Sequence, residues 1–325
     1  MPNRKVLKGI KPFNKFSFKT CYYHQLISVY SYFGIDESVL ISNYLPVYGT
    51  TDKKILPAGK ELNIFSIKEM EEKTGIREIV EGNTDDIISE AIACIDNNSP
   101  IIVAVDTFYL DYRRDACKEQ HLCHYILLYG YDKTEKEFTA TEHYYINSFN
   151  YKECKIPFAV IENAFTECKK IMQDNSRLIV KFKRIKKMKP VVDGNVYLEL
   201  YKSNAAKLEN SFNCLKNAVS YIKEKLKSER NFRKAYNDML TFFETLKWQK
   251  LYQRNTMSMF FGMDSDIYEW VTRIMENFVY VHGVIVKTYY TKSFEEKSVG
   301  KIVARIDEVL ALEQRVHSIL AGVQL

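Results

Sequence analysis

Two stretches of the chain decide the fold of its first half: PIIVAVD at residues 100–106 and HLCHYILLYGYD at residues 121–132. Each contains a short run of apolar, β-branched or aromatic residues, which is typical of a strand buried on both faces. The first run ends on Asp106 and the second begins at His124. A hairpin between the two strands would bring this carboxylate and this imidazole to the same end of a sheet.

The rest of this half mixes helices and strands. Further strands are expected at residues 138–141 and 178–182, and helices at 21–33, 66–73 and 85–97. Helices that precede and follow strands able to pair as hairpins indicate the α+β class with a largely antiparallel sheet.

The second half has the pattern of long helices. From about residue 195 apolar residues recur at alternating steps of four and three, the spacing of one helical face. The four faces begin at Leu208, Phe232, Ile267 and Ile302. Four amphipathic helices of this length predict an α-helical bundle.

A basic run followed by Pro190 and a turn at Asp193 and Gly194 separates the two halves. The chain has 325 residues, which is more than one hydrophobic core usually serves. We therefore predict a catalytic domain over residues 1–190 and a helical bundle domain over residues 191–325.

Composition narrows the class of protein. The chain is 46% hydrophobic and 27% charged, as in folded globular proteins. A net charge of +6 is modest for this length, so no nucleic-acid partner is expected. The sequence has no signal peptide and no apolar run of membrane-spanning length, which predicts a cytoplasmic protein with no membrane partner. Seven cysteines are an odd, unevenly spaced set and are expected to be reduced.

Cys21 stands out among these cysteines because of its position. Thr20 is a candidate N-cap, so Cys21 would begin a helix. Unpaired N–H groups and the positive end of the helix dipole favour a thiolate there. Together with His124 and Asp106, Cys21 could form a nucleophile, base and orienting carboxylate. An inert buried cysteine is the alternative interpretation.

A zinc site is the competing interpretation of the residues around His124. Cys117, His121, Cys123 and His124 lie within eight residues. Structural zinc sites usually add a second close pair of ligands, and the chain has no C-x-x-C partner. The sequence also lacks a phosphate-binding glycine loop. We therefore predict neither a metal nor another cofactor.

Three separate motifs resemble the N-terminal domain of the butirosin aminoacyltransferase family. They are FKTC at 18–21 with the helix that ends YFG at 32–34, then PIIVAVD with YLDY at 109–112, then HLCHYILLYGYD. The similarity covers about residues 15–185 and leaves out the helical half. The family is papain-like, is related to peptidases that process bacteriocin leaders, and belongs to antibiotic biosynthesis.

This resemblance implies roles for particular residues. Cys21 matches the nucleophile and His124 the base. Asp106 matches an acidic position of the family and is the expected third member of the triad. Glu142 is the alternative, because papain-like enzymes often take the orienting residue from the strand after the histidine.

The oxyanion donor departs from the papain-like pattern. Papain-like peptidases place a glutamine six residues before the cysteine, and Lys15 stands there. The candidates for this donor are Lys15 and its neighbour Asn14, together with the backbone N–H of Cys21.

The resemblance implies a thiol acyltransferase of antibiotic or nonribosomal peptide biosynthesis. Its expected partners are an acyl or peptidyl carrier protein with a phosphopantetheine thioester, and a small-molecule amine. The amide-forming enzyme of closthioamide biosynthesis, a polythioamide pathway, is a proposed analogue. Two alternatives stay open: a cysteine peptidase or amidase, and a non-catalytic papain-like binding module.

Overall fold

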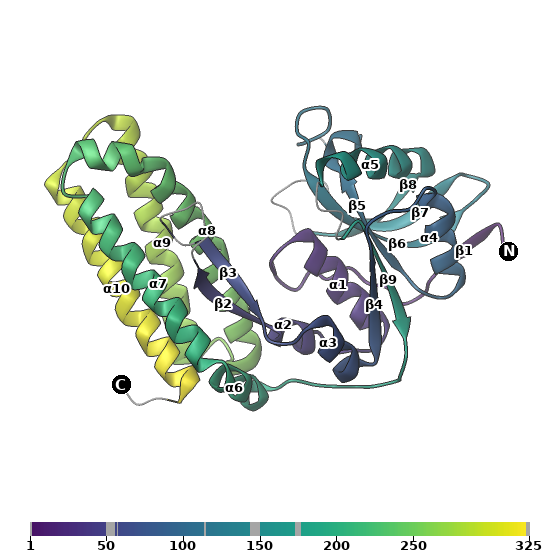
Figure 1. The fold of residues 1–325 in the computed structure, drawn as a ribbon, viewed down its shortest axis with the longest axis horizontal. Coiled ribbons are helices and arrows are strands. Elements are labelled where there is room, and N and C mark those ends of the chain that lie inside the picture. Colours follow the sequence, from purple (N-terminus) through teal and green to yellow (C-terminus); the bar gives the residue numbers. More distant parts are fainter. Residues whose placement is uncertain are drawn as a thin grey trace. The chain divides into compact units, whose positions relative to one another are not determined.

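The computed structural model of the chain (Figure 1) describes residues 2–49, 56, 58–113, 115–143, 150–172 and 177–322. The chain divides into two compact units. The first unit consists of Met1–Val39 and Phe65–Val191, and the second of Leu40–Ile64 and Val192–Leu325. The second unit therefore includes Leu40–Ile64, which the sequence analysis assigned to the domain that carries the sheet.

The first unit is built around a seven-stranded sheet, in which six strands follow the order β4-β9-β5-β6-β7-β8. The seventh strand, β1, pairs with the C-terminal end of β6. All its pairs of strands are antiparallel. The strands are β1 (Arg4–Val6), β4 (Ile76–Glu81), β5 (Ile101–Asp106), β6 (Cys123–Asp132), β7 (Glu137–Glu142), β8 (Lys152–Pro157) and β9 (Ile179–Arg184). The predicted α+β class with an antiparallel sheet is confirmed.

The hairpin expected between the two apolar runs is the centre of this sheet. Strands β5 and β6 pair with Val105 opposite His124 and Asp106 opposite Cys123. Every residue of β5 is buried. Farther along β6, a Cβ on Gly130 would lie 2.9 Å from both Thr139 and Val6, so only glycine lets β1 and β7 approach β6 there.

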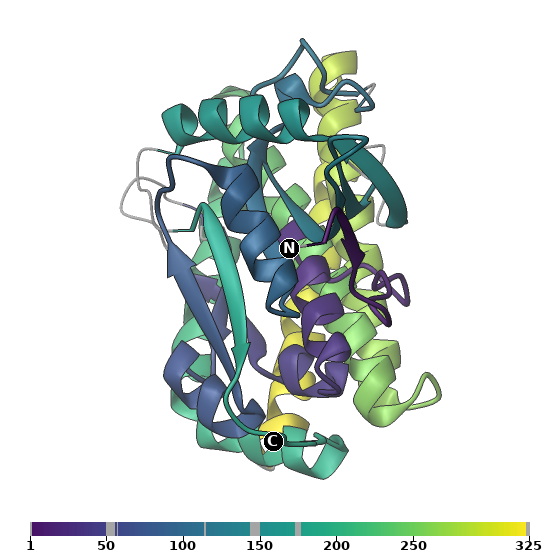
Figure 2. The ribbon, with the colours of Figure 1, turned by 90° about the vertical axis from the view of Figure 1, so that its right-hand side faces the viewer.

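Helix α3 (Ile67–Thr74) of the first unit begins and ends at residues with the expected capping chemistry. Ser66 forms a capping box with Glu69, and Gly75 ends the same helix in the left-handed conformation. The helices are α1 (Cys21–Tyr32), α3 (Ile67–Thr74), α4 (Ile87–Asp96) and α5 (Phe158–Ile171), and α2 (Glu37–Ser42) leads toward the second unit. Figure 2 shows α4 in blue and α5 in teal on the side of the sheet that faces the viewer.

The second unit contains the four predicted helices, one short helix before them, and a hairpin. The helices are α6 (Gly194–Ser203), α7 (Ala205–Lys225), α8 (Glu229–Phe261), α9 (Asp266–Thr291) and α10 (Glu296–Ala321), and the hairpin strands are β2 (Tyr44–Gly49) and β3 (Ala58–Asn63). The predicted helical region is confirmed as α7–α10. No helix in the described part of the chain combines the length and the apolar character needed to cross a membrane.

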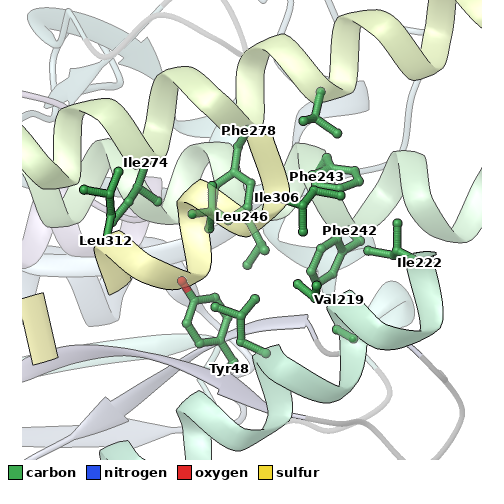
Figure 3. Packing of buried hydrophobic residues seen from close by; sticks show 14 of the residues in the cluster. Tyr48, Val219, Ile222, Phe242, Phe243, Leu246, Ile274, Phe278, Ile306 and Leu312 are labelled. Atoms are coloured by element: carbon green, nitrogen blue, oxygen red, sulfur yellow. The ribbon is translucent and has the colours of Figure 1, made fainter. Parts of the chain in front are cut away.

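The hairpin shares one apolar core with these helices. Leu45 and Tyr48 are buried in the same cluster as Phe242 and Leu246 of α8. Figure 3 shows Tyr48 beside residues of α8 in this cluster. The hydroxyl of Tyr48 donates a hydrogen bond to Glu313 of α10. The hairpin is therefore part of the helical core by both its apolar and its polar contacts.

Candidate active site

Cys21 is the first residue of α1, as the sequence predicted, and its side chain is half-buried. Thr20 occupies the N-cap position in an extended conformation, but its side chain makes no capping hydrogen bond. The first N–H groups of α1 therefore lack a hydroxyl cap from Thr20. An anionic oxygen beside Cys21 could accept hydrogen bonds from such groups.

Side chains of α1 hold the segment that leads to Cys21. Nε2 of His24 accepts a hydrogen bond from the N–H of Phe18 at 3.0 Å, and Nδ1 donates to the carbonyl of Phe13 at 3.1 Å. One turn later, Oγ of Ser28 accepts from the N–H of Phe13 at 3.1 Å. These contacts require the neutral tautomer with the proton on Nδ1. Burial lowers the pKa of His24 to about 4, so its ring is uncharged at neutral pH.

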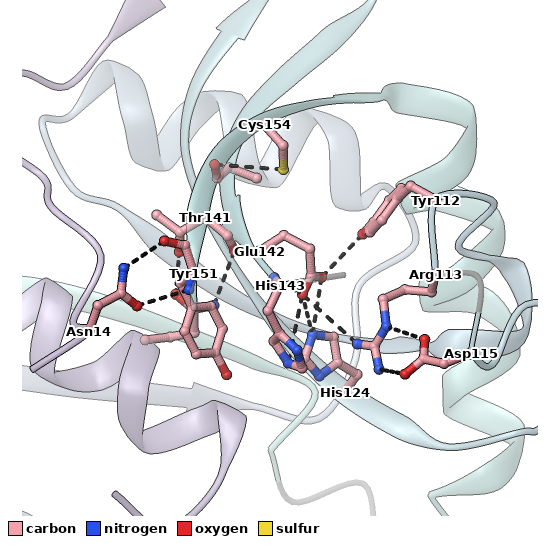
Figure 4. A network of polar contacts seen from close by, with 12 residues as sticks. Asn14, Tyr112, Arg113, Asp115, His124, Thr141, Glu142, His143, Tyr151 and Cys154 are labelled. Carbon is pink, nitrogen blue, oxygen red and sulfur yellow. Dashed lines mark hydrogen bonds and ion pairs between the residues drawn. The ribbon is translucent and has the colours of Figure 1, made fainter. Parts of the chain in front are cut away.

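His124 lies between Cys21 and a carboxylate. Its Nε2 is 2.9 Å and 3.0 Å from the two carboxylate oxygens of Glu142 (Figure 4), and its ring also hydrogen-bonds to the side chain of Cys21. Because Glu142 occupies Nε2, Nδ1 is the nitrogen left for Cys21. The described structure thus joins Cys21, His124 and Glu142 in one chain of contacts.

The charges of this group stabilise one another. Burial by itself lowers the pKa of His124, but Glu142 and Cys21 outweigh it and raise the pKa to about 10. Burial raises the pKa of Glu142, and His124 more than offsets this, so the pKa of Glu142 lies below its usual value. At neutral pH the two residues form a buried imidazolium–carboxylate pair.

Several further groups hold the Glu142 carboxylate, which is fully buried. The hydroxyl of Tyr112 donates to one oxygen at 3.2 Å, and the backbone N–H of His143 donates to the other at 2.6 Å. Nη1 of Arg113 lies 3.9 Å from the same carboxylate and its guanidinium also binds Asp115 (Figure 4). The sequence analysis missed Arg113, and it included Tyr112 only as part of the YLDY motif.

Asp106, the favoured third member of the triad, lies elsewhere. Its Oδ2 is 2.7 Å from Nδ1 of His121, and its Oδ1 accepts from the N–H of Phe108 at 3.1 Å. In the β5–β6 register His124 stands opposite Val105, and adjacent strand residues point to opposite sides of a sheet. The carboxylate that contacts His124 is therefore Glu142, which was the alternative.

The two oxyanion candidates have other partners. Nζ of Lys15 pairs with the carboxylate of Glu37. The side-chain amide of Asn14 donates to the carbonyl of Tyr151 at 2.7 Å and accepts from its N–H at 2.8 Å. Neither contact is with Cys21, so the main-chain N–H groups at the start of α1 are the donors that remain from the original prediction.

One group of three His, Cys, Asp or Glu residues in the described part of the chain has the geometry to share a metal ion. One ligand atom each of His124, Glu142 and His143 lie within 4.8 Å of one another. Two imidazoles and a carboxylate are a usual donor set for zinc. Here the charge of Glu142 is already balanced by His124, and the backbone N–H of His143 occupies one of its oxygens. The group is therefore satisfied by hydrogen bonds between its own members.

Comparison with models of protein families gives a match to part of the chain. A family model described as "Butirosin biosynthesis protein H, N-terminal" matches residues 42–143. No curated protein matches the chain. The matched segment is shorter than the similarity expected from the motifs, and Cys21 lies before its first residue. Over residues 42–143, the segment that contains both His124 and Glu142, the chain is similar to the N-terminal part of butirosin biosynthesis protein H.

Proposed function

We propose that the first unit is a thiol acyltransferase that forms an amide through an acyl intermediate on Cys21. The observation that carries this proposal is the buried His124, which lies between the Cys21 sulfur and the Glu142 carboxylate. A cationic imidazole beside a thiol favours the thiolate, which is the nucleophilic form. The match to a biosynthetic family supports a transferase over a degradative peptidase.

The proposed reaction has two balanced halves. His124 already holds the proton as an imidazolium, and the Cys21 sulfur attacks the carbonyl carbon of a thioester as the thiolate. The donor thiol leaves with the proton from His124, so that the acyl group is held as a thioester on Cys21. An amine then attacks the same carbon, gives its proton to His124, and displaces the Cys21 thiolate.

Glu142 and the start of α1 have supporting roles in this scheme. Glu142 stabilises the imidazolium that is present before the first half and forms again in the second, and it keeps Nδ1 directed at Cys21. Main-chain N–H groups at the start of α1 would bind the oxyanion of each tetrahedral intermediate. Because a thioester donor is already activated, the reaction needs no nucleotide.

The donor that we propose is an acyl or peptidyl carrier protein that bears a phosphopantetheine thioester, and the acceptor is a small-molecule amine. The family match supports a place in antibiotic biosynthesis. Amide formation of the kind needed for closthioamide is the more specific hypothesis. It comes from the motifs at Cys21 and His124 and not from the family match.

Intact-mass spectrometry with a panel of acyl thioesters tests the proposal. The wild-type chain should gain the mass of one acyl group, and an added amine should remove it as an amide. Cys21→Ala should gain none, whereas Cys117→Ala, which removes another half-buried thiol of the first unit, should react like the wild type. Absence of an adduct with every thioester and peptide would contradict the proposal and favour a binding module.

Two further results separate the remaining alternatives. Release of the adduct by water with no amide formed, together with cleavage of peptides, would identify a peptidase. A zinc centre at His124, Glu142 and His143 would make turnover sensitive to a chelator and recoverable with zinc. The thiol mechanism instead predicts an unchanged rate after chelation.

A further inference from the structure

Three sulfur atoms converge where α5 ends beside the first residue of β6. Sγ of Cys123 lies 3.8 Å from Sγ of Cys168 and 3.3 Å from Sδ of Met172. Cys168 and Met172 are four residues apart, and the N–H of Met172 donates to the carbonyl of Cys168 at 3.0 Å. Helical spacing therefore directs both side chains from the same side of α5 toward Cys123. The proposed acyl transfer uses none of these three residues.

The distances suit a shared metal ion better than a disulfide. Metal–thiolate bonds of about 2.3 Å place three ligands in a plane about 4.0 Å apart. The Cys123–Cys168 distance of 3.8 Å is close to this value. The shorter contact to Met172 would have to open by about 0.7 Å, which a side chain with three rotatable bonds can absorb. A disulfide would instead require the two thiols to approach by about 1.7 Å.

The donor atoms indicate which ion would bind. Two thiols and one thioether are soft ligands, and Cys and Met together select Cu(I) over the hard cations. Zinc in a structural site would require a fourth ligand. The nearby carboxylate of Asp106, which stands opposite Cys123, is already bound by His121 and by the N–H of Phe108. Three soft donors, beside a carboxylate that other groups already bind, favour Cu(I).

The surroundings both shelter the cluster and leave a path to it. Cys168 is fully buried, whereas Cys123 and Met172 are half-buried, so an ion could reach the site from solvent. The hydroxyl of Tyr125 hydrogen-bonds to the Cys123 sulfur and would orient it from outside the ligand set. Binding would release the two thiol protons and leave one Cu(I) held by two thiolates and one thioether.

From this geometry we infer that Cys123, Cys168 and Met172 form a binding site for a soft monovalent metal ion, Cu(I), in the first unit. The site has no residue in common with Cys21, His124 and Glu142. The proposed Cu(I) site and the proposed acyl transfer can therefore be tested independently of each other.

Anaerobic titration of the full-length chain with Cu(I), in competition with a chromophoric Cu(I) chelator, tests this inference. The Cys21→Ala variant serves as the parent, so that the reactive thiol cannot contribute. One equivalent of Cu(I) should bind, and X-ray absorption should show three sulfur ligands at about 2.3 Å. Zinc(II) should bind more weakly, and a preference for zinc would overturn the assignment to Cu(I).

Substitutions locate the bound ion. Met172→Leu keeps the volume and apolar character of the side chain and should weaken Cu(I) binding by about tenfold or more. Cys168→Ser should abolish stoichiometric binding. Cys94→Ala removes a buried thiol of α4 outside the cluster and should leave the affinity unchanged. Equal loss in the Met172 and Cys94 variants, or nitrogen and oxygen ligands in the absorption spectrum, would refute the site.

Discussion

Glu142 is the residue on which the charge of His124 depends. Burial alone would keep the imidazole neutral, and the carboxylate reverses this preference. In the Glu142→Gln variant the pKa of His124 should fall, so the thiolate of Cys21 would lose its cationic partner at neutral pH. We expect alkylation of Cys21 by iodoacetamide to slow about a hundredfold at pH 7 and to recover only at alkaline pH. Mass spectrometry of the modified cysteine over a pH series measures this.

Asp106→Asn is the matched control for that experiment. It makes the same change at a buried carboxylate whose histidine partner is His121. The pH profile of Cys21 alkylation should be that of the wild type. An equal shift in both variants would mean that Glu142 has no special role in the charge of His124.

At the scale of elements, α1 depends on the uncharged form of His24. The pKa of His24 is lowered by burial to about 4, so protonation opposes the fold. Above the ordinary histidine pKa of about 6.5, neutral His24 makes its full contribution to the free energy of unfolding. This contribution declines as the pH falls toward 4. Between pH 7 and pH 5 the wild-type free energy of unfolding should fall by about 2 kcal/mol through this group. His24→Gln, which can still donate and accept but does not titrate, should lack this part of the decline.

Urea unfolding of the first unit at the two pH values measures the difference, with far-UV circular dichroism as the signal. The His24→Gln variant should be less stable than the wild type at pH 7, because its side chain cannot satisfy Phe13 and Phe18 with the same geometry. If the free energy of unfolding fell equally in both proteins between pH 7 and pH 5, protonation of His24 would have no part in the decline.

Local sequence patterns predicted the helices and strands well, but they predicted less well which side chains come into contact in the fold. The strand ending on Asp106 and the strand around His124 follow from apolar runs within a few residues. The helix begins at Cys21 as predicted, although the expected cap Thr20 makes no capping hydrogen bond. The choice between Asp106 and Glu142 depended instead on strand register, and a shift of one residue turns a side chain to the other face. Thr141 pairs with Leu127, which brings Glu142 into phase with His124. No signal in either strand alone contains that information.

Two other features lay beyond sequence reasoning for related reasons. The Met172 sulfur reaches Cys123 from the residue directly after α5, a helix that the sequence analysis did not predict. The hairpin β2–β3 has a partly polar sequence. Its apolar residues pack against helices that follow more than a hundred residues later in the chain. Both contacts are set by tertiary packing.

At the level of the whole molecule, the β2–β3 hairpin comes from the N-terminal part of the sequence but belongs to the second, helical unit. The N–H of Ile64 donates to the carbonyl of Asn43 at 2.9 Å, so residues 44–63 could be replaced by a short glycine-rich turn. The replacement removes Leu45 and Tyr48 from the core, at a cost of about 3–6 kcal/mol to the second unit. Alkylation of Cys21 should persist, because the first unit keeps its own sheet and core.

Tryptophan fluorescence isolates this effect. Both tryptophans of the chain, Trp248 and Trp270, lie in the second unit, so a urea titration followed by their emission reports on that unit. In the variant that lacks the hairpin, the urea midpoint of the second unit should fall. The rate of Cys21 alkylation should stay at the wild-type value. An unchanged midpoint, or loss of Cys21 reactivity, would contradict the division of the chain into these units.

The order of strands in the sheet also determines when the protein can fold during synthesis. Strand β4 pairs only with β9, which is made about a hundred residues later. At about 5–20 residues per second, a nascent β4 waits on the order of 5–20 s for its neighbour. The β2–β3 hairpin, which is made before β4, waits longer for α7–α10. Apolar segments from both units are thus exposed on the ribosome together during this interval, and such exposed surface favours aggregation.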